Sequence, residues 1–307
     1  VPVILDSPNG ESWSVLGKLS FNGDPGFNED EVPATSPIPP VVSPRLVRLR
    51  DEVDGEIYDV LFVTLERAGR DVSGYIVGRL DGTEFTVSKG FQLVDFGHDF
   101  SRPRNTNTTT GTIAQEHRYD RAVILGLLNG NGRGDDATKH PTWEAEGWAN
   151  SLSLPRAVTL QGGVLYQTPA QGLPDAVKLS DYAQSWTGVL EVPKGSSVTV
   201  TLRDGSGDPA VVIRHTGEDI SLDRSMSKAF DYYFKDSAPA VAPLAEGDSD
   251  TLTIIQDGAS VEVFVDGGLV AMSSRVYFDG GCSDIEVSTE GEAVIEQSWS
   301  RTGSKRS

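Results

Sequence analysis

Cysteine and long apolar runs are the two features that this 307-residue sequence has least of. It contains a single cysteine, Cys282, so an internal disulfide is excluded, and the chain suits a reducing compartment without excluding secretion. No apolar run approaches the roughly 18 residues that a membrane-spanning helix needs. The composition therefore predicts a soluble protein without a membrane partner, either secreted or cytoplasmic.

Positive charge is also scarce. Lys and Arg number 26 against 45 Asp and Glu, which gives a net charge of −19. Such a chain repels phosphate backbones and anionic lipid, so we expect neither nucleic acid nor a membrane surface as a partner. The four histidines are scattered without i, i+4 pairing and predict no metal site: His98, His117, His140 and His215. Residues 129–136 lack the ligand spacing of an EF-hand and the lysine of a P-loop, so no cofactor is expected.

Short runs of β-branched residues, separated by many of the 33 Gly and 17 Pro residues, dominate the rest of the sequence. Residues 59–64, 122–126 and 197–202 are examples, each bounded by Gly, Asp or Pro, as is typical of strands. No stretch over about 12 residues keeps a 3.6-residue apolar period, so few helices are expected. The predicted fold class is all-β.

The length of the chain favours two β-rich units over a single core. Residues 167–178 interrupt the strand pattern with Thr-Pro-Ala and Gly-Leu-Pro, and we interpret them as a linker. The first unit then comprises residues 1–166, and the second comprises residues 167–307, which is the size of a β-sandwich. A propeller blade is a four-stranded meander of several dozen residues, so the first unit has room for two to three blades.

Several motifs occur in an order known from one protein family. Residues 81–85 read Asp-Gly-Thr-Glu-Phe, and residues 94–100 read Val-Asp-Phe-Gly-His-Asp-Phe. Further motifs follow at residues 121–127, 147–169 and 260–277, the last containing Val-Glu-Val-Phe and Ser-Ser-Arg. Together they resemble the fourth and fifth blades, the propeller exit and the sandwich of glycoside hydrolase family 32, the family of invertases, levanases and inulinases.

This resemblance implies an incomplete five-bladed β-propeller of about two to three blades, followed by a C-terminal β-sandwich. So few blades cannot close a ring, and the propeller unit would leave sheet edges and one apolar face exposed. A second chain, or self-association, is the partner expected to cover them. The ligand that the family implies is a fructose-containing carbohydrate.

The chemistry of the family needs two carboxylates about 5 Å apart, one to attack the anomeric carbon and one to protonate the leaving oxygen. We find no match to the family's nucleophile stretch, Trp-Met-Asn-Asp-Pro-Asn-Gly, so no catalytic residue is identified. The strand that carries the family's acid/base Glu aligns with residues 41–49 and puts Val42 at that position, where valine cannot transfer a proton. Glu29, Asp30 and Glu31 lie upstream. An insertion could bring one of them to the pocket, and otherwise they are solvated loop charges.

Four further residues occupy positions that form the fructose site in the family. Asp99 fits its motif, and it either accepts a hydrogen bond from a sugar hydroxyl or turns the strand. Ser101 and Leu127 stand where the family usually has Tyr and Trp, so both remove stacking area for a sugar ring. Arg102 replaces a small Ala and either contacts a phosphate or blocks the pocket. Glu262, in a sandwich strand, is expected to be exposed or salt-bridged.

Two functions stay open at this point. The chain is either a portion of a β-fructosidase-like hydrolase, which cleaves β-fructosides such as sucrose, levan or inulin by a retaining double displacement, or a non-catalytic carbohydrate-binding or structural relative. In the first case the missing carboxylates leave it inactive alone. In the second case it self-associates or pairs with another chain.

Overall fold

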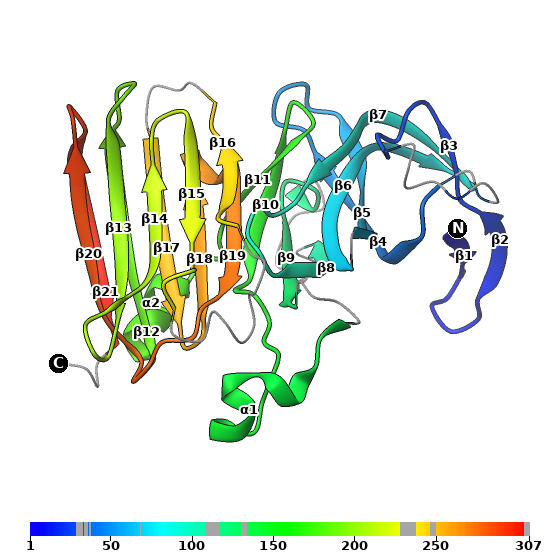
Figure 1. Cartoon of the computed structure of the whole chain (residues 1–307). Helices are drawn as coiled ribbons and strands as arrows, with labels where there is room; N and C mark the ends of the chain where they lie inside the picture. The colour runs from blue at the N-terminus through cyan, green and yellow to red at the C-terminus, as the bar shows by residue number, and fades with distance from the viewer. Residues whose placement is uncertain are drawn as a thin grey trace. The chain divides into compact units, whose positions relative to one another are not determined.

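The computed structural model describes residues 1–28, 33, 36, 38–67, 69–107, 117–129, 134–227, 238–245 and 250–303. Most regular structure in these ranges is β-strand, which confirms the all-β fold class (Figure 1). The chain divides into two compact units that alternate along the sequence. The first comprises residues 1–94, 101–134 and 157–165, and the second comprises residues 95–100, 135–156 and 166–307.

The longest strands of the first unit form a five-stranded sheet with the order β3-β7-β6-β5-β4. Its strands are β3 (Ser20–Asn22), β4 (Val41–Arg50), β5 (Ile57–Arg67), β6 (Arg70–Asp81) and β7 (Glu84–Leu93). Strands β4 to β7 form an antiparallel meander, and β3 pairs parallel with β7. Leu61 and Val63, two positions apart on β5, are buried in one cluster with Ile76 and Phe85. Val60 and Phe62, which point to the opposite face of β5, are fully buried as well, so both faces of this strand are covered.

A second meander forms a four-stranded sheet in chain order: β8 (Phe100–Asn107), β9 (Ala122–Leu128), β10 (Arg156–Gln161) and β11 (Val164–Pro169). Buried and half-buried residues alternate along the whole of β9, as the period of two predicts. The β10–β11 hairpin turns at Gly162 and Gly163, whose φ angles of 58° and 76° favour glycine. Asp51 accepts hydrogen bonds from both of their N–H groups, at 2.9 and 2.7 Å, and so fixes this turn beside the end of β4.

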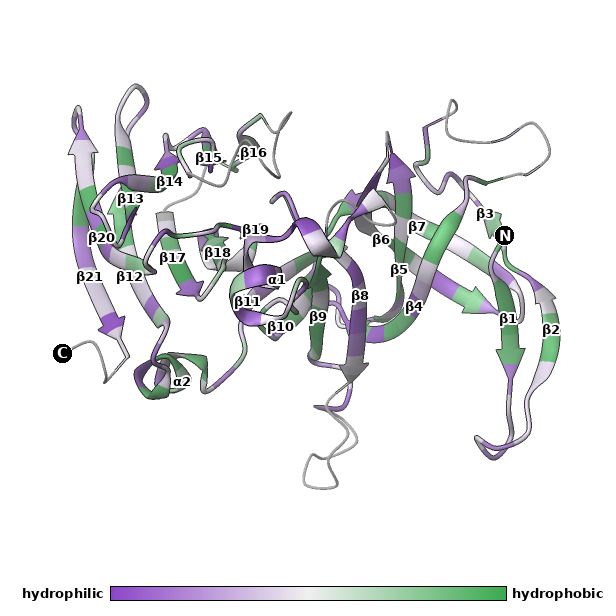
Figure 2. Ribbon diagram, turned by 60° about the horizontal axis from the view of Figure 1, so that its bottom comes forward, coloured by the Kyte–Doolittle hydropathy of each residue, from purple (hydrophilic) through white to green (hydrophobic). Residues whose placement is uncertain are grey.

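The first two strands form a ribbon of their own. β1 (Val3–Asp6) and β2 (Ser14–Lys18) pair antiparallel in a two-stranded sheet. Leu5, Val15 and Leu16 are each more than half exposed, and β1 is apolar along most of its length (Figure 2). A two-stranded ribbon is marginally stable by itself, because it has too few residues to form a core.

The second unit contains a β-sandwich. One sheet has the order β19-β18-β17-β12-β21, and the other has the order β16-β15-β14-β13-β20 (Figure 1). The strands are β12 (Ala183–Glu191), β13 (Ser197–Asp204), β14 (Pro209–His215), β15 (Asp219–Asp223), β16 (Ala240–Pro243), β17 (Asp250–Asp257), β18 (Ser260–Val265), β19 (Val270–Arg275), β20 (Cys282–Glu290) and β21 (Val294–Thr302). Val200 and Leu202 from one sheet are buried in a single cluster with Ile254 and Val263 from the other. This shared core makes the two sheets one sandwich.

Short helices complete the second unit. α1 (Pro141–Glu146) begins at a proline and ends at Gly147, whose φ of 79° is typical of a helix C-terminus. α2 (Leu173–Leu179) overlaps the segment 167–178 that the sequence indicated as a linker and extends one residue beyond it, and it packs on β12 and β21. Two 3-10 turns lie at Ala137–Lys139 and Asp266–Gly268.

Candidate functional site

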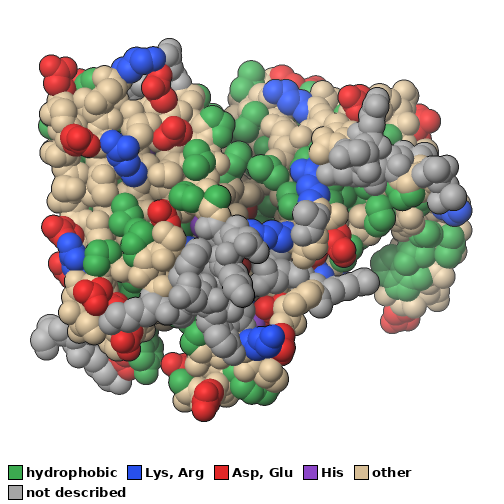
Figure 3. All heavy atoms as spheres, viewed as in Figure 1, with side chains coloured by type: hydrophobic (Ala, Val, Ile, Leu, Met, Phe, Trp, Pro, Cys, Tyr) green, Lys and Arg blue, Asp and Glu red, His purple; other side chains and the backbone are tan. Residues whose placement is uncertain are grey.

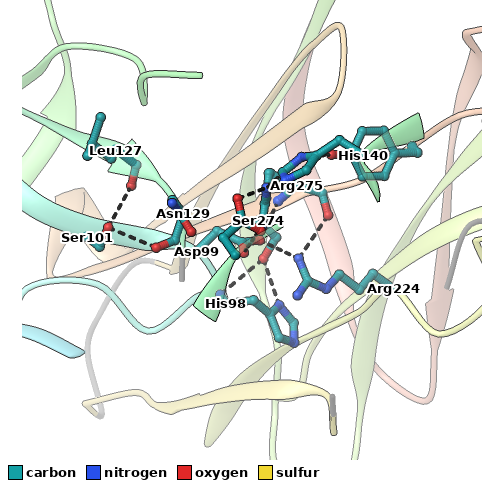
Figure 4. A network of polar contacts seen from close by, with 11 residues as sticks. His98, Asp99, Ser101, Leu127, Asn129, His140, Arg224, Ser274 and Arg275 are labelled. Carbon is teal, nitrogen blue, oxygen red and sulfur yellow. Dashed lines mark hydrogen bonds and ion pairs between the residues drawn. The ribbon is translucent and has the colours of Figure 1, made fainter. Parts of the chain in front are cut away.

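Asp99 lies in the short segment of residues 95–100 and is buried in the second unit. Its Oδ2 accepts hydrogen bonds from the backbone N–H of Arg275, at 2.7 Å, and from Nη1 of Arg224, while Oδ1 lies 3.5 Å from Nη2 of Arg275 (Figure 4). Burial acts to raise the pKa of Asp99, but the charges of Arg224 and Arg275 outweigh it and hold that pKa well below its ordinary value. Both oxygens have protein partners, which favours the structural role of Asp99. Sugar binding by Asp99 stays a prediction.

Arg275 extends this network to His140, the residue before α1. Nη1 of Arg275 lies 3.0 Å from Nδ1 of His140, and Nε2 of His140 lies 2.8 Å from Oδ2 of Asp135. Burial lowers the pKa of His140, the hydrogen bond to Asp135 opposes this, and the charge of Arg275 adds to the lowering. A neutral imidazole fits both contacts, because Nδ1 then accepts from Arg275 and Nε2–H donates to Asp135. The network therefore ties the start of α1 to β19.

Ser101 and Leu127 are brought together in the first unit. The hydroxyl of Ser101 is buried and donates to the backbone oxygens of Leu127, at 3.5 Å, and Asn129, at 3.1 Å (Figure 4). Ser101 thus joins β8 to the end of β9. Both residues take part in holding the sheet together. The loss of sugar-stacking area at these two positions remains a prediction.

Arg102 has an unusual backbone, with a φ of 49°. Its N–H donates to Oγ of Ser73 at 3.0 Å, and its Nε donates to Oδ2 of Asp71 at 2.6 Å. The side chain of Arg102 is 25% exposed, whereas that of Asp71 is 3% exposed. Asp71 therefore orients the guanidinium of Arg102 and leaves part of it open to solvent.

Nη1 of Arg104 donates to the backbone oxygen of Arg102 at 3.1 Å, so a second arginine lies beside the first. Nδ2 of Asn105 donates to the backbone oxygen of Leu46 at 3.1 Å, which brings the segment that contains Arg104 beside the one that contains Arg45. Burial lowers the pKa of Arg104, and the charges of Arg45 and Arg102 lower it further. We call these three guanidinium groups the arginine cluster. Guanidinium groups in proximity suit an anion such as a phosphate. Contact of Arg102 with a phosphate remains a prediction.

Val42, at the position aligned with the proton donor, pairs with Thr64 in the β4–β5 ladder and is partly buried. It brings no ionisable group to this end of β4. The three acids considered as replacements lie outside the described residues: Glu29, Asp30 and Glu31.

A buried ion group around Arg156 is a feature that the sequence analysis did not anticipate. Nη2 of Arg156 lies 2.7 Å from Oδ2 of Asp95 and 3.0 Å from Oε2 of Glu262. Nη1 donates to Oε1 of Gln167 at 3.0 Å, and Nη2 also donates to Oγ of Ser273. Glu262, expected to be exposed or salt-bridged, is salt-bridged and fully buried. The side chains of Arg156 and Glu262 have no solvent exposure, so the group is enclosed within the second unit.

Burial and the charge of Arg156 have opposite effects on the pKa values of the two carboxyls in this group. Burial raises the pKa values of Asp95 and Glu262, and the charge of Arg156 only partly offsets that effect. The guanidinium of Arg156 also lies over the ring of Phe100, 4.4 Å from its centroid, where a cation–π contact adds to its stabilisation. One cation therefore stabilises two buried carboxylates.

Gly97 is required by a close approach of its backbone to β19. A Cβ at this position would lie 2.2 Å from the backbone oxygen and 2.3 Å from the backbone nitrogen of Ser273. We expect Gly97→Ala to lower the free energy of unfolding by about 1–3 kcal/mol, because the main chain of β19 must move to admit the methyl group. Urea denaturation measures the loss, with Gly134→Ala as the matched control, since its Cβ would meet no atom within 4 Å. Equal midpoints for the two variants would contradict the expectation.

Comparison with protein families decides the ancestry of these motifs. The model described as "Glycosyl hydrolases family 32 N-terminal domain" matches residues 3–169, and the model "Glycosyl hydrolases family 32 C terminal" matches residues 170–300. The chain belongs to glycosyl hydrolase family 32. This confirms the resemblance that the motifs indicated.

Curated family 32 proteins share about a quarter of their residues with the chain. It is 25% identical over 313 residues to "Sucrose-6-phosphate hydrolase" of Bacillus subtilis, a match that covers 95% of this chain and 59% of the relative. It is 24% identical over 242 residues to "Sucrose-6-phosphate hydrolase" of Staphylococcus xylosus, covering 71% of this chain and 45% of that relative. The chain thus spans about half the length of the curated relatives it matches.

Solved family 32 structures share the fold. The exo-inulinase from Aspergillus awamori matches with a TM-score of 0.72 and 18% identity over 97% of this chain and 61% of its own. The sucrose-6-phosphate hydrolase from Lactobacillus gasseri matches with a TM-score of 0.67 and 19% identity over 95% of this chain and 58% of its own. At these identities the likeness extends to the fold alone.

Two further observations concern metals and membranes. Within the part of the chain that the structure describes, no group of three or more His, Cys, Asp or Glu side chains could hold a metal ion. None of the described helices has the length and apolar character needed to cross a bilayer.

Proposed function

We propose that this family 32 chain is a portion of a β-fructosidase-like hydrolase that acts on β-fructosides such as sucrose, levan or inulin. The observation that carries this proposal is the match of both family models, in order, over residues 3–169 and 170–300. Relatives named sucrose-6-phosphate hydrolase and raffinose invertase support this class of substrate.

The proposed reaction is a retaining double displacement, in which one carboxylate attacks the anomeric carbon and a second one protonates the leaving oxygen. We propose that this chain supplies neither carboxylate and is inactive alone. Val42 at the aligned donor position supports this, because its side chain carries no proton to transfer. The burial of Asp99 between Arg224 and Arg275 also supports it, since a carboxylate held by two cations is a poor proton donor.

The proposed architecture of the first unit is an incomplete five-bladed propeller with two to three blades. The meanders β4 to β7 and β8 to β11 support two blades, because each has four strands in chain order. The ribbon β1–β2 would belong to another blade. The greater length of the relatives leaves room for the others.

A second chain or a second copy is the proposed partner of this propeller, in keeping with the alternative that the protein is a structural, non-catalytic relative. The exposed apolar residues of the β1–β2 ribbon support it, and hydrophobic side chains gather over this ribbon at the right of Figure 3. Apolar side chains on an open edge gain stability when another surface covers them.

The arginine cluster of Arg45, Arg102 and Arg104 supports an anionic substrate over a neutral one. Arginine binds phosphate oxygens through paired N–H groups, and a chain with a net charge of −19 would otherwise repel such a ligand. A phosphorylated sugar is therefore the member of the β-fructoside class that we propose for this site.

The activity test measures fructose release by the purified chain from sucrose, sucrose 6-phosphate, inulin and levan. We expect no release above the buffer blank. Release that disappears in Glu29→Gln or Glu31→Gln, but persists in Asp24→Asn from the same segment, would assign an acid to the reaction and overturn the proposed inactivity. The proposed partner is tested separately by native mass spectrometry of the chain alone and of the chain mixed with an extract of its source. A monomer in both samples would contradict the proposal.

A further inference from the structure

A cavity of about 670 Å³ lies in the second unit, apart from the residues discussed above as the fructose site. Its walls come from α1, from residues 181–182 before β12, from the β17–β18 turn and from residues 277–282 after β19. The volume falls in the range of small-molecule sites, about 300–1,000 Å³. The cavity is therefore large enough for a small saccharide.

Aromatic rings form part of this cavity. Trp148, Tyr182 and Tyr277 all line it, and Tyr182 is 65% exposed. Nε1 of Trp148 donates to Oε2 of Glu146 at 2.6 Å, which fixes the orientation of the indole. Aromatic rings combine a rigid apolar body with a polar edge, and they pack against the C–H faces of sugar rings at little cost in side-chain entropy.

The charged residues of the cavity lining are all acidic. Glu146, Asp181 and Asp257 line it, and its described lining contains no Lys, Arg or His. Carboxylates accept hydrogen bonds from sugar hydroxyls, whereas they repel phosphate groups. The charge of the cavity is therefore opposite to that of the arginine cluster, and the two sites suit different ligands.

Gln256 gives the cavity an acceptor that lacks a partner. Its side chain is fully buried in the cavity wall, and Nε2 donates to the backbone oxygen of Gly258 at 2.8 Å. Among the described residues, Oε1 of Gln256 has no hydrogen-bond partner. A buried acceptor without a partner is unfavourable, and a hydrogen bond from a ligand hydroxyl would relieve this.

We propose that this cavity is a binding site for a neutral saccharide, with Tyr182 as the stacking surface and Gln256 as a hydroxyl acceptor. The site takes part in recognition and not in bond cleavage. It is independent of the proposed hydrolase function, because its residues come from the second unit only and the arginine cluster comes from the first.

The test is a titration of the full chain with nystose, a neutral fructose-containing oligosaccharide, in an isothermal titration calorimeter. We expect a dissociation constant in the millimolar range, a weakening of at least about tenfold in Tyr182→Ala, and a comparable weakening in Gln256→Met. Trp299→Ala is the matched control, since it removes an exposed aromatic side chain of β21 away from the cavity lining, and it should bind as the parent does. Thermal melts of each variant confirm that it folds.

Three outcomes would overturn the proposal. The first is that titration of the folded parent chain with nystose releases or absorbs no measurable heat of binding. The second is binding that Arg102→Met abolishes and Tyr182→Ala leaves intact, which would assign the saccharide to the first unit. The third is binding of choline without binding of nystose, which would make the cavity a site for organic cations. Fructose release by the chain bears on none of these outcomes, so the two proposals can fail separately.

Discussion

Replacement of Arg156 by methionine is expected to lower the free energy of unfolding by about 3–5 kcal/mol, the range for breaking a buried ion pair from one side. The methionine fills most of the same volume, so the loss comes from charge and not from a cavity. It leaves Asp95 and Glu262 buried without the cation that both contact. Because burial already raises the pKa values of these two carboxyls, the variant should take up protons as it folds. Its deficit against the parent should therefore grow as the pH rises from acid to neutral.

Urea denaturation at several pH values measures this deficit. Arg203→Met is the matched control, since Arg203 pairs with Glu286 in the same unit but both side chains are partly exposed. Pairs of that kind contribute at most about 1 kcal/mol, because water screens them. If Arg156→Met and Arg203→Met lose the same stability, the Arg156 group is not held by its charges and our account of it is wrong.

Asp99→Asn is the second substitution with a large expected effect, again about 3–5 kcal/mol near neutral pH. It removes the carboxylate charge that Arg224 and Arg275, both buried, contact. The pKa of Asp99 in the folded chain lies below its ordinary value of 3.8. The stability that this depressed pKa contributes is fully present above about pH 4 and is lost as the pH falls through the folded-state pKa. The difference between the parent and Asp99→Asn should therefore shrink on acidification below that point.

Melting temperatures of both proteins between neutral pH and acid give the measurement. Glu290→Gln serves as the control, because Glu290 pairs with Arg214 on the exposed surface of the same unit. A constant difference between the parent and Asp99→Asn throughout the acid range would show that the carboxylate charge has no part in holding β19.

The strands could be predicted because their information is local. Residues 59–64 fall inside β5, residues 122–126 inside β9 and residues 197–202 inside β13. β-branched runs bounded by Gly, Asp or Pro have few other conformations to adopt. α2 was not predicted, since a helix of seven residues is too short to display an apolar period.

The polar networks could not be predicted from spacing. Asp99 finds Arg224 and the backbone of Arg275 at separations of 125 and 176 residues, and only the folded sandwich brings them together. Glu262 was expected to be exposed or salt-bridged, and the salt bridge exists. Its burial follows from the position of β18 between β17 and β19, where nearly every residue of the strand is enclosed. A single sequence gives the pattern of a strand but not its place within the sheet.

The alternation of the two units along the chain limits how the protein can be cut. A fragment starting at residue 167 would contain every strand of the sandwich, from β12 onwards, and would look like a transferable module. It would keep Glu262 but lose Arg156, the cation that pairs with it, and it would keep Arg275 but lose the carboxylate of Asp99. The sandwich is therefore expected to require the preceding segments for expression as a well-folded product, and a fusion or truncation designed at that boundary would expose orphaned charges in its interior.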